Sequence, residues 1–402
     1  MKVLILNTSD ARGGAAVVSH RLMEALCCRG VDAKMIVVER LTDDLRVAVA
    51  GTPEERKMAF LRERLGIFLA NGFNRRDLFK VSTARYGVDV LSHPWLKEAD
   101  VVCLNWINQG MLSLSAIRAI ADMGKKIIWT MHDMWCCTGV CHHAYDCNRY
   151  ERQCGNCPFM RMPYSSDISR RIWKRKRRLY TSADIHFVAV SRWLAQCCRN
   201  SGLLSDKKIS VIPNALPVER FAYERRGDKQ KTVVAMGAAR LDDPVKGFDI
   251  LIDATKHIVR QRSDSNIQLL LFGTIRNEQL LSQLQLPYRF VGAVDGSRIP
   301  EIMTESDIVV SSSHFETLPT TLIEGQAAGC LAVAFNHGGQ ADIINHLTDG
   351  YLAEYPDAVD LARGILWAAD HKGDVEQRKM RHESVARRFS PEVVADAYLH
   401  LF

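Results

Sequence analysis

Two glutamates stand around the start of an expected helix in the segment HFETLPTTLIEGQAAG, residues 314–329. Glu316 precedes this helix and Glu324 lies on it, with Pro319 suited to the first helical position and Gly329 to the exit. From Pro319 to Glu324 a helix rises roughly 7 Å, at about 1.5 Å per residue. Because carboxylates accept hydrogen bonds in pairs, the two suit the hydroxyls at either end of a sugar, a diphosphate and a ribose. Solvated helix-end residues are the alternative.

A diphosphate between these hydroxyls would meet free backbone N–H groups at the start of the helix, where the helix dipole favours an anion. These groups belong to Leu318, Thr320 and Thr321. Arg240 and Lys246, in GAARLDDPVKG of residues 237–247, would flank the same diphosphate. Fixed cations at a departing phosphate lower the barrier to its departure. Asp242 and Asp243 are interpreted as loop acids rather than metal ligands.

Two further motifs follow predicted strands in the first half of the chain. Gly13 and Gly14 end the turn SDARGG, where glycine lets backbone amides approach a phosphate or sugar closely. The turn is not GxGxxG, which argues against a nicotinamide cofactor. His132, in WTMHDMW, could hydrogen-bond a transferred sugar or its acceptor. A glycine turn without a ligand and a structural histidine are the alternatives.

Cysteines concentrate in CHHAYDCNRYERQCGNCP, residues 141–158. Four of them could close a tetrahedral structural metal site, with zinc as the candidate, that braces a loop; four thiolates leave no open position for catalysis. They are Cys141, Cys147, Cys154 and Cys157. Free thiols and redox pairs are the alternatives. The twelve cysteines of the chain include three adjacent pairs, a poor geometry for a disulfide framework, so reduced thiols are expected.

The densest basic run is SRRIWKRKRRLY, residues 169–180, with Ile172, Trp173 and Leu179 as apolar interruptions. On a helix this run could contact an anionic membrane surface, or it could be a solvated basic face. No nucleic-acid-binding module surrounds it. No window is apolar for the length of a bilayer span and residues 1–7 are too short for a signal peptide, which predicts a cytoplasmic protein.

The elements that must position these residues are strands and helices that alternate along the whole chain, as in parallel sheets covered on both faces. Strands are predicted over residues 2–6, 33–38, 101–105, 126–131, 185–190, 209–212, 232–237, 268–273, 289–294, 307–313, 331–335 and 351–353. The alternation restarts after Asn214, so two doubly wound α/β domains are expected, 1–214 and 215–389. The first carries the Cys-rich insert 136–158, and a C-terminal helix over 390–402 could return to it.

Taken together, these motifs resemble the retaining family-4 glycosyltransferases of GT-B fold. The resemblance is carried by Glu316 with Glu324, Arg240 with Lys246, the Ile-Pro-Asn sequence 212–214, and Gly13 with Gly14. The insert HDMWCCTGVCHH with its later cysteines is similar to a bacterial subgroup that includes the colanic acid glycosyltransferase, whose members build exopolysaccharide, capsule or O-antigen-type repeats.

The resemblance implies that the C-terminal domain binds a UDP- or GDP-sugar without a catalytic cofactor. Glu324 would hold the ribose, Glu316 the transferred sugar, and Arg240 with Lys246 the diphosphate. The Gly13–Gly14 loop would close against the diphosphate, and His132 would contact the sugar. Further donor contacts are implied for Gly237, Thr317, Leu318 and Thr320, where Thr317 and Leu318 replace the Gly-rich residues common in the family. The implied acceptor is a lipid-linked oligosaccharide.

Two alternatives remain on the same architecture. A nucleotide-sugar epimerase would need no acceptor, and a phosphorylase would need a cofactor-binding lysine that is not identified here. A non-catalytic scaffold or regulator that binds nucleotide sugars is the second, although it would not need both glutamates and both cations. Because no nucleophile is identified, the resemblance implies front-face transfer, in which the departing phosphate oxygen accepts the acceptor's proton.

Overall fold

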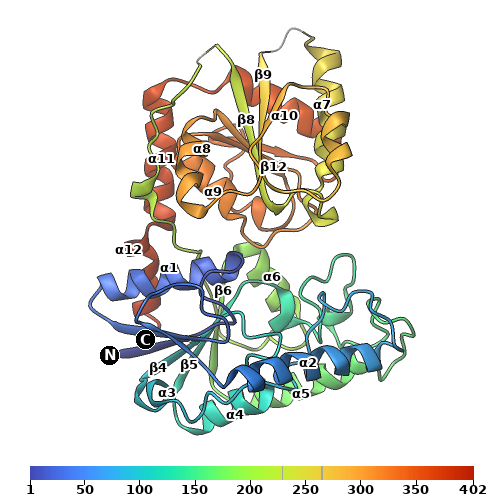
Figure 1. Ribbon diagram of the computed structural model, residues 1–402, viewed down its shortest axis with the longest axis vertical. Helices are drawn as coiled ribbons and strands as arrows, with labels where there is room; N and C mark the ends of the chain where they lie inside the picture. Colours follow the sequence, from blue (N-terminus) through green and yellow to red (C-terminus); the bar gives the residue numbers. More distant parts are fainter. Residues whose placement is uncertain (229, 264–265) are drawn as a thin grey trace. The chain divides into compact units, whose positions relative to one another are not determined.

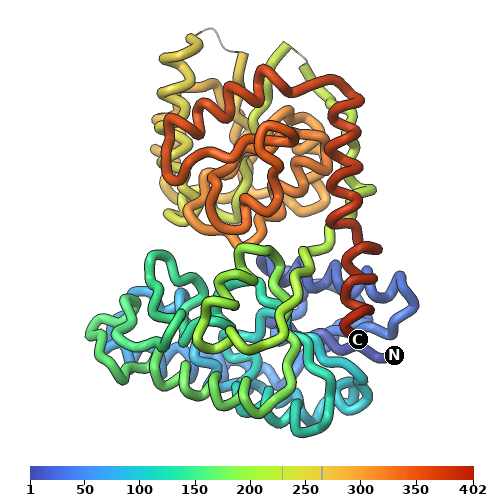
Figure 2. The backbone as a smooth tube through the Cα atoms, turned by 180° about the vertical axis from the view of Figure 1, so that it is seen from behind, coloured from blue at the N-terminus to red at the C-terminus, as the bar shows by residue number. Residues whose placement is uncertain are grey.

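The computed structural model describes residues 1–228, 230–263 and 266–402. Contacts divide the chain into two compact units, each built around its own sheet (Figures 1 and 2). The first unit comprises Met1–Ala215 together with Val394–Phe402, and the second comprises Leu216–Val393. Each unit is described separately below.

The first unit has a seven-stranded parallel sheet in the order β3-β2-β1-β4-β5-β6-β7. Its strands are β1 (Lys2–Leu6), β2 (Asp32–Val37), β3 (Val47–Val49), β4 (Val101–Leu104), β5 (Lys126–Met131), β6 (Ile185–Ala189) and β7 (Ile209–Val211). Its helices are α1 (Gly14–Cys28), α2 (Pro53–Ala70), α3 (Pro94–Glu98), α4 (Leu114–Asp122), α5 (Ile168–Ser182) and α6 (Arg192–Asn200). The strand order reverses between β1 and β4, which is where ligands bind in open sheets of this kind.

The second unit has a six-stranded parallel sheet in the order β10-β9-β8-β11-β12-β13. Its strands are β8 (Thr232–Arg240), β9 (Ile267–Thr274), β10 (Tyr288–Phe290), β11 (Ile308–Ser311), β12 (Leu331–Phe335) and β13 (Gly350–Ala353). Its helices are α7 (Phe248–Gln261), α8 (Ile299–Thr304), α9 (Thr320–Ala327), α10 (Ala358–Asp370) and α11 (Val375–Phe389). Here the order reverses between β8 and β11, which places a second switch point beside Arg240 and Glu316.

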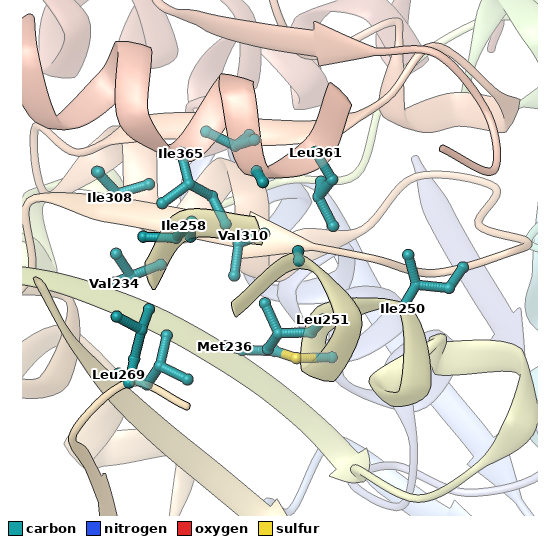
Figure 3. Packing of buried hydrophobic residues seen from close by; sticks show 14 of the residues in the cluster. Val234, Met236, Ile250, Leu251, Ile258, Leu269, Ile308, Val310, Leu361 and Ile365 are labelled. Carbon is teal, nitrogen blue, oxygen red and sulfur yellow. The ribbon is translucent and has the colours of Figure 1, made fainter. Parts of the chain in front are cut away.

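The core of the second unit shows why its strands are nearly continuous apolar runs. Side chains from β8, β9 and β11 meet those of α7 and α10 on one face of the sheet (Figure 3). Helix α9 covers the other face, where Gly325 packs against Val309, so the strands are buried on both sides. Val234, Leu269 and Ile308 from the strands are fully buried. All twelve predicted strands are present in the two sheets. The sequence missed β3, a three-residue edge strand too short for a periodic signal.

The last helix, α12 (Pro391–Leu399), ends the chain against the first unit. Val394, Ala395 and Tyr398 are buried in the same cluster as strands β1 and β2. The Tyr398 hydroxyl lies 2.8 Å from Thr130 Oγ1 of β5, and both groups are buried. In the described part of the chain, no helix combines the length and the apolar character needed to cross a membrane.

Removing the Tyr398 hydroxyl tests how firmly this last helix holds the first unit. Tyr398→Phe leaves Thr130 Oγ1 without its buried partner, so the free energy of unfolding is expected to fall by about 1–3 kcal/mol. Tyr398→Ala also leaves a cavity and is expected to cost about 3–5 kcal/mol. Denaturant unfolding measures both. Tyr288→Phe, at a tyrosine that is 41% exposed, is the matched control and is expected to change stability by less than about 0.5 kcal/mol; equal effects at both tyrosines would contradict the interpretation.

Candidate functional site

Three loops meet at the carboxyl ends of neighbouring strands in the second unit. The His314 N–H donates to the Val245 carbonyl at 2.8 Å, which ties the loop after β11 to the loop after β8. The Gly339 N–H donates to the Glu316 carbonyl at 2.8 Å, which ties the same loop to the one after β12. Residues from positions 240–247, 312–318 and 337–340 therefore form one constellation.

At its centre, Lys246 and Glu316 form an ion pair, with 2.6 Å between Lys246 Nζ and Glu316 Oε1. The Lys246 side chain is 30% exposed and that of Glu316 is 18% exposed. Burial by itself would lower the pKa of the Lys246 ammonium, but the charge and hydrogen bond of Glu316 raise it overall. Lys246 is therefore a cation at neutral pH. It is held beside a carboxylate that can accept hydrogen bonds from hydroxyl groups.

Arg240 ends β8 on the same edge of the sheet. Its guanidinium lies 3.6 Å from Asp242 Oδ1 and 3.1 Å from Asp243 Oδ2. Asp242 also accepts the backbone N–H groups of Arg276 and Asn277, each at 3.1 Å. Both aspartates therefore orient the Arg240 loop, as loop acids do.

Helix α9 begins at Thr320, and Pro319 is its N-cap rather than its first helical residue. Gly329 follows the helix in a left-handed conformation, with φ of 79°, as its predicted role at the exit requires. Glu324 is buried on this helix, with 7% of its surface exposed, so it is not a solvated surface residue. Thr320 is half-buried and Leu318 is buried at the mouth of the helix.

At two positions of this constellation, close packing leaves room only for glycine. A Cβ on Gly237 would lie 1.9 Å from the Phe272 ring, which accounts for Gly237 without any ligand contact. A Cβ on Gly339 would lie 1.7 Å from the Thr317 carbonyl oxygen, so this glycine lets the loop after β12 support the loop that carries Glu316.

The sequence reasoning missed the contribution of the loop after β12. Gln340 is fully buried; its Nε2 donates to the Ser313 carbonyl at 3.1 Å, and its Oε1 accepts from Ser311 Oγ at 2.7 Å. His314 Nδ1 lies 2.9 Å from the Tyr355 hydroxyl, and the His337 ring stacks on Tyr355 at 4.3 Å. The signal was available in Gly338-Gly339, which follow the predicted strand 331–335 after two intervening residues.

In the first unit, Gly13 and Gly14 line a hollow of about 340 Å³ at the carboxyl ends of β1 and β4. This volume falls within the range of small-molecule sites. Helix α1 begins at the hollow with Gly13 as an N-cap that has no side-chain cap hydrogen bond. Arg12 pairs there with Glu39 at 3.1 Å, and Trp106 forms part of the lining.

His132 follows β5, and its Nε2 lies 2.8 Å from Asn105 Oδ1 after β4. An amide oxygen only accepts, so Nε2 carries the proton in this arrangement. Burial lowers the pKa of His132 from 6.5 to about 4, and the charge of Asp133 opposes this only in part. The imidazole is therefore neutral at pH 7 and acts as a hydrogen-bonding group rather than a cation.

A buried chain of polar groups behind His132 was also missed. Asp133 Oδ2 accepts from Trp106 Nε1 at 2.9 Å and from His142 Nδ1 at 2.7 Å. His142 Nε2 lies 3.0 Å from Ser82 Oγ. The hydrogen-bond order is that of a Ser-His-Asp triad, but Ser82 is fully buried and inaccessible as a nucleophile. The chain instead connects the Cys-rich insert to Trp106 at the hollow.

The four cysteines proposed as metal ligands line one small hollow of the insert together with Tyr150. All twelve cysteines are free thiols. Burial raises the pKa of Cys154 to about 11 and that of Cys157 to about 12, and Cys154 Sγ accepts the Gly139 N–H at 3.1 Å. Within the described ranges, no group of three or more His, Cys, Asp or Glu side chains is arranged to hold a metal ion. The placement of these thiols therefore does not support the predicted structural zinc.

The basic run 169–180 forms helix α5, and its apolar residues do not face outward. Ile172 and Leu179 are buried against the first unit and Trp173 is half-buried. Lys176 is also fully buried; its ammonium donates to the Trp135 carbonyl at 2.5 Å and to the Thr138 carbonyl at 3.1 Å. The helix therefore presents charge to solvent, without the apolar interruptions noted in the sequence.

Both halves of the chain match known protein families. Residues 12–220 match the family model described as Glycosyltransferase Family 4, and residues 219–387 match the model described as Glycosyl transferases group 1. The two matches meet at the boundary between the units.

Individual relatives agree with these matches. Phosphatidyl-myo-inositol mannosyltransferase of Mycobacterium tuberculosis is 29% identical over 203 residues, which cover 48% of this chain and 53% of the relative. UDP-Gal:alpha-D-GlcNAc-diphosphoundecaprenol alpha-1,3-galactosyltransferase of Escherichia coli is 26% identical over 191 residues, 44% of this chain and 49% of the relative. The chain thus spans about half the length of the curated relatives it matches.

Among solved structures, Anabaena Alr3699/HepE in complex with UDP and glucose has a TM-score of 0.62 at 16% identity. The match covers 100% of this chain and 99% of that one. This likeness confirms the predicted fold, two doubly wound domains of GT-B type.

The state of His132 can be tested by NMR titration of the histidine side chains. Because its pKa is about 4, its imidazole signals are expected to stay constant from pH 8 to about pH 5.5. His20, whose pKa is raised by its hydrogen bond to Glu24, is expected to titrate above 6.5 in the same spectra. Below pH 6.5 His132 binds a proton in the unfolded chain but stays neutral in the folded protein. Its contribution to the free energy of unfolding therefore falls as the pH decreases towards 4. A His132 midpoint near 6.5 would contradict its burial.

Proposed function

Because the chain belongs to glycosyltransferase family 4, we propose that it is a retaining glycosyltransferase that moves a sugar from a nucleotide sugar to a glycan acceptor. The observation that carries this proposal is the Lys246–Glu316 pair, with its 2.6 Å contact at the switch point of the second sheet. A cation and a hydroxyl acceptor side by side suit the two chemically different ends of a sugar–phosphate bond.

The donor-site roles follow from where each group lies. Arg240 and Lys246 supply positive charge for the diphosphate, and the start of α9 adds its free N–H groups. Glu316 is half-buried, and its backbone carbonyl accepts a hydrogen bond from the Gly339 N–H, which fixes its position. Its carboxylate accepts hydrogen bonds from hydroxyls of the transferred sugar. Glu324, buried further along α9, accepts from the ribose. A UDP-sugar is the first donor to test, since UDP occupies the similar Anabaena structure; a GDP-sugar is the second.

The proposed reaction is front-face transfer. The bond between the sugar carbon and the diphosphate oxygen breaks, and its electron pair stays on that oxygen, where Arg240 and Lys246 stabilise the charge. The acceptor hydroxyl attacks the same face, and its proton passes to the departing phosphate oxygen. Neutral His132, fixed by Asn105, contributes a hydrogen bond to the sugar.

For the acceptor we propose a lipid-linked oligosaccharide in exopolysaccharide, capsule or O-antigen-type biosynthesis at the cytoplasmic face of a membrane. The name of the Escherichia coli relative includes a diphosphoundecaprenol-linked sugar, which supports this acceptor class. The exposed basic residues of α5 would then lie near anionic lipid.

Binding of nucleotides tests the donor site directly. Calorimetry with UDP, GDP and ADP is expected to show binding of one of them to the wild type. Arg240→Ala, Lys246→Ala and Glu324→Ala should each weaken it by about 1–3 kcal/mol, or about 5- to 150-fold, through loss of charged hydrogen bonds. Lys256→Ala is the matched control, because that lysine on α7, whose side chain is 42% exposed, pairs with Asp253 and should leave affinity unchanged. No nucleotide binding by the wild type would contradict the proposed donor site.

Reaction products separate transfer from the alternative activities. Glu316→Gln keeps the shape of the side chain but removes the charge, so kcat should fall by about 100-fold or more while nucleotide affinity changes little. An NMR time course with the wild type should show the sugar carbon's configuration retained in the product. Inverted product would refute front-face transfer, and conversion of the donor sugar without any acceptor would indicate an epimerase.

A further inference from the structure

Helix α2 presents an apolar stripe to solvent. Met58, Leu61, Leu65 and Leu69 follow one another at intervals of three and four residues, which places them on one face of the helix. They are 47%, 46%, 53% and 51% exposed, respectively. A surface helix ordinarily turns such a stripe towards the core. This stripe faces away from the core and is therefore available to a binding partner.

The inward face of the same helix explains why the stripe cannot turn inward. Glu63 is fully buried and accepts hydrogen bonds from the Thr83 N–H at 2.5 Å, the Thr83 hydroxyl at 2.6 Å and the Ala84 N–H at 3.2 Å. Arg64 beside it donates to the Leu78 carbonyl. Rotating the helix would leave a buried carboxylate without partners, at a cost of several kcal/mol. The outward direction of the leucines is therefore built into the fold.

The exposed apolar surface continues beyond the end of α2. Phe73, two residues after the helix C-cap, is 70% exposed, and Met162, which follows the Cys-rich insert, is 68% exposed. The two chain segments are adjacent, because a Cβ on Gly72 would lie 3.2 Å from the Met162 methyl carbon. The Asn71 side chain fixes this junction by accepting the Arg161 N–H at 2.6 Å.

Positive charge borders this apolar surface. The last residue of α2, Ala70, and two arginines of α5 line one hollow of about 270 Å³, so the helices are neighbours, as Figures 1 and 2 also show. Arg171, Lys174, Arg175, Arg177 and Arg178 of α5 are all exposed. Arg62 lies within the exposed face of α2 itself, whereas the exposed acidic residues of this helix, Glu54 and Glu55, are confined to the first turn.

The geometry points to an anionic lipid bilayer as the partner of this α2–α5 surface, defined by Met58, Leu61, Leu65, Leu69, Phe73, Met162 and the exposed basic residues of α5. The leucines of α2 enter the boundary between headgroups and acyl chains, and the cations of α5 lie against lipid phosphates. A second copy of the chain fits less well, since a two-fold contact would bring the same arginine-rich border against itself. This surface is independent of the donor site, because it rests on exposure and charge in the first unit alone.

Vesicle co-sedimentation of the full chain tests the inference. The wild type is expected to bind vesicles of phosphatidylcholine with phosphatidylserine, and to bind pure phosphatidylcholine weakly. The double variant Leu61→Gln/Leu65→Gln should reduce binding about tenfold or more, and Arg171→Gln/Arg175→Gln should reduce both binding and its salt dependence. The matched control is Leu41→Gln/Leu45→Gln, at leucines of the same unit that are 53% and 89% exposed, which should bind as the wild type does.

Three results would overturn the inference. They are no binding of the wild type to either vesicle, equal loss in the control and α2 variants, or a wild-type dimer in solution that the α2 variant alone abolishes. Calorimetry with UDP on the same proteins separates this surface from the proposed function. Vesicle binding without any nucleotide binding would support the docking surface and contradict the glycosyltransferase proposal. Nucleotide binding without vesicle binding would support the donor site and contradict the docking surface.

Discussion

The candidate donor site depends on the parallel pairing of β8 with β11, in which Val234 lies opposite Ile308. Parallel strands send their carboxyl ends to one edge, so the loops that follow them must meet even though about seventy residues of chain separate them. Lys246 and Glu316 are brought to 2.6 Å by this pairing, and the third neighbour, β12, adds the Gly338–Gln340 turn beneath Glu316. The chemistry of the site thus follows from the topology of the sheet.

The ion pair also shows how such a site is kept ready for a ligand. Each member is partly buried, and a partly buried charge without a partner is costly. Lys246 and Glu316 therefore neutralise one another in the free protein, and a donor would exchange that contact for a phosphate at one side and hydroxyls at the other. The charge of Arg240 is also balanced in the free protein, because Asp242 and Asp243 pair with its guanidinium at the end of β8.

In the first unit, the Cys-rich insert has a structural role that does not depend on a metal. His142, next to Cys141, reaches Asp133 at the end of β5, and Asp133 holds the indole of Trp106 at the hollow beside Gly13. Burial alone would raise the pKa of the Asp133 carboxyl, but the charge and hydrogen bond of His142 keep it well below its usual range. The insert thereby shapes one wall of the hollow through a charged hydrogen-bond chain, and Met162, which follows the insert, extends the apolar stripe of α2.

The sequence by itself determined twelve of the thirteen described strands, the two-domain organisation and the family. Buried parallel strands are continuous apolar runs, and the motif residues stand in the loops and the helix that follow them. Glu316, Glu324, Arg240, Lys246 and His132 could all be proposed in this way. Only the tertiary structure decided which of them touch, that Gly237 is a packing residue against Phe272, and that the four thiols of the insert line one hollow. It also decided that Ile172 of the basic run faces the core while Leu61 and Leu65 face solvent. The physical reason is that periodicity gives the spacing of side chains along a helix or strand but not which face turns inward. That orientation depends on buried partners elsewhere in the chain, as Thr83 is for Glu63.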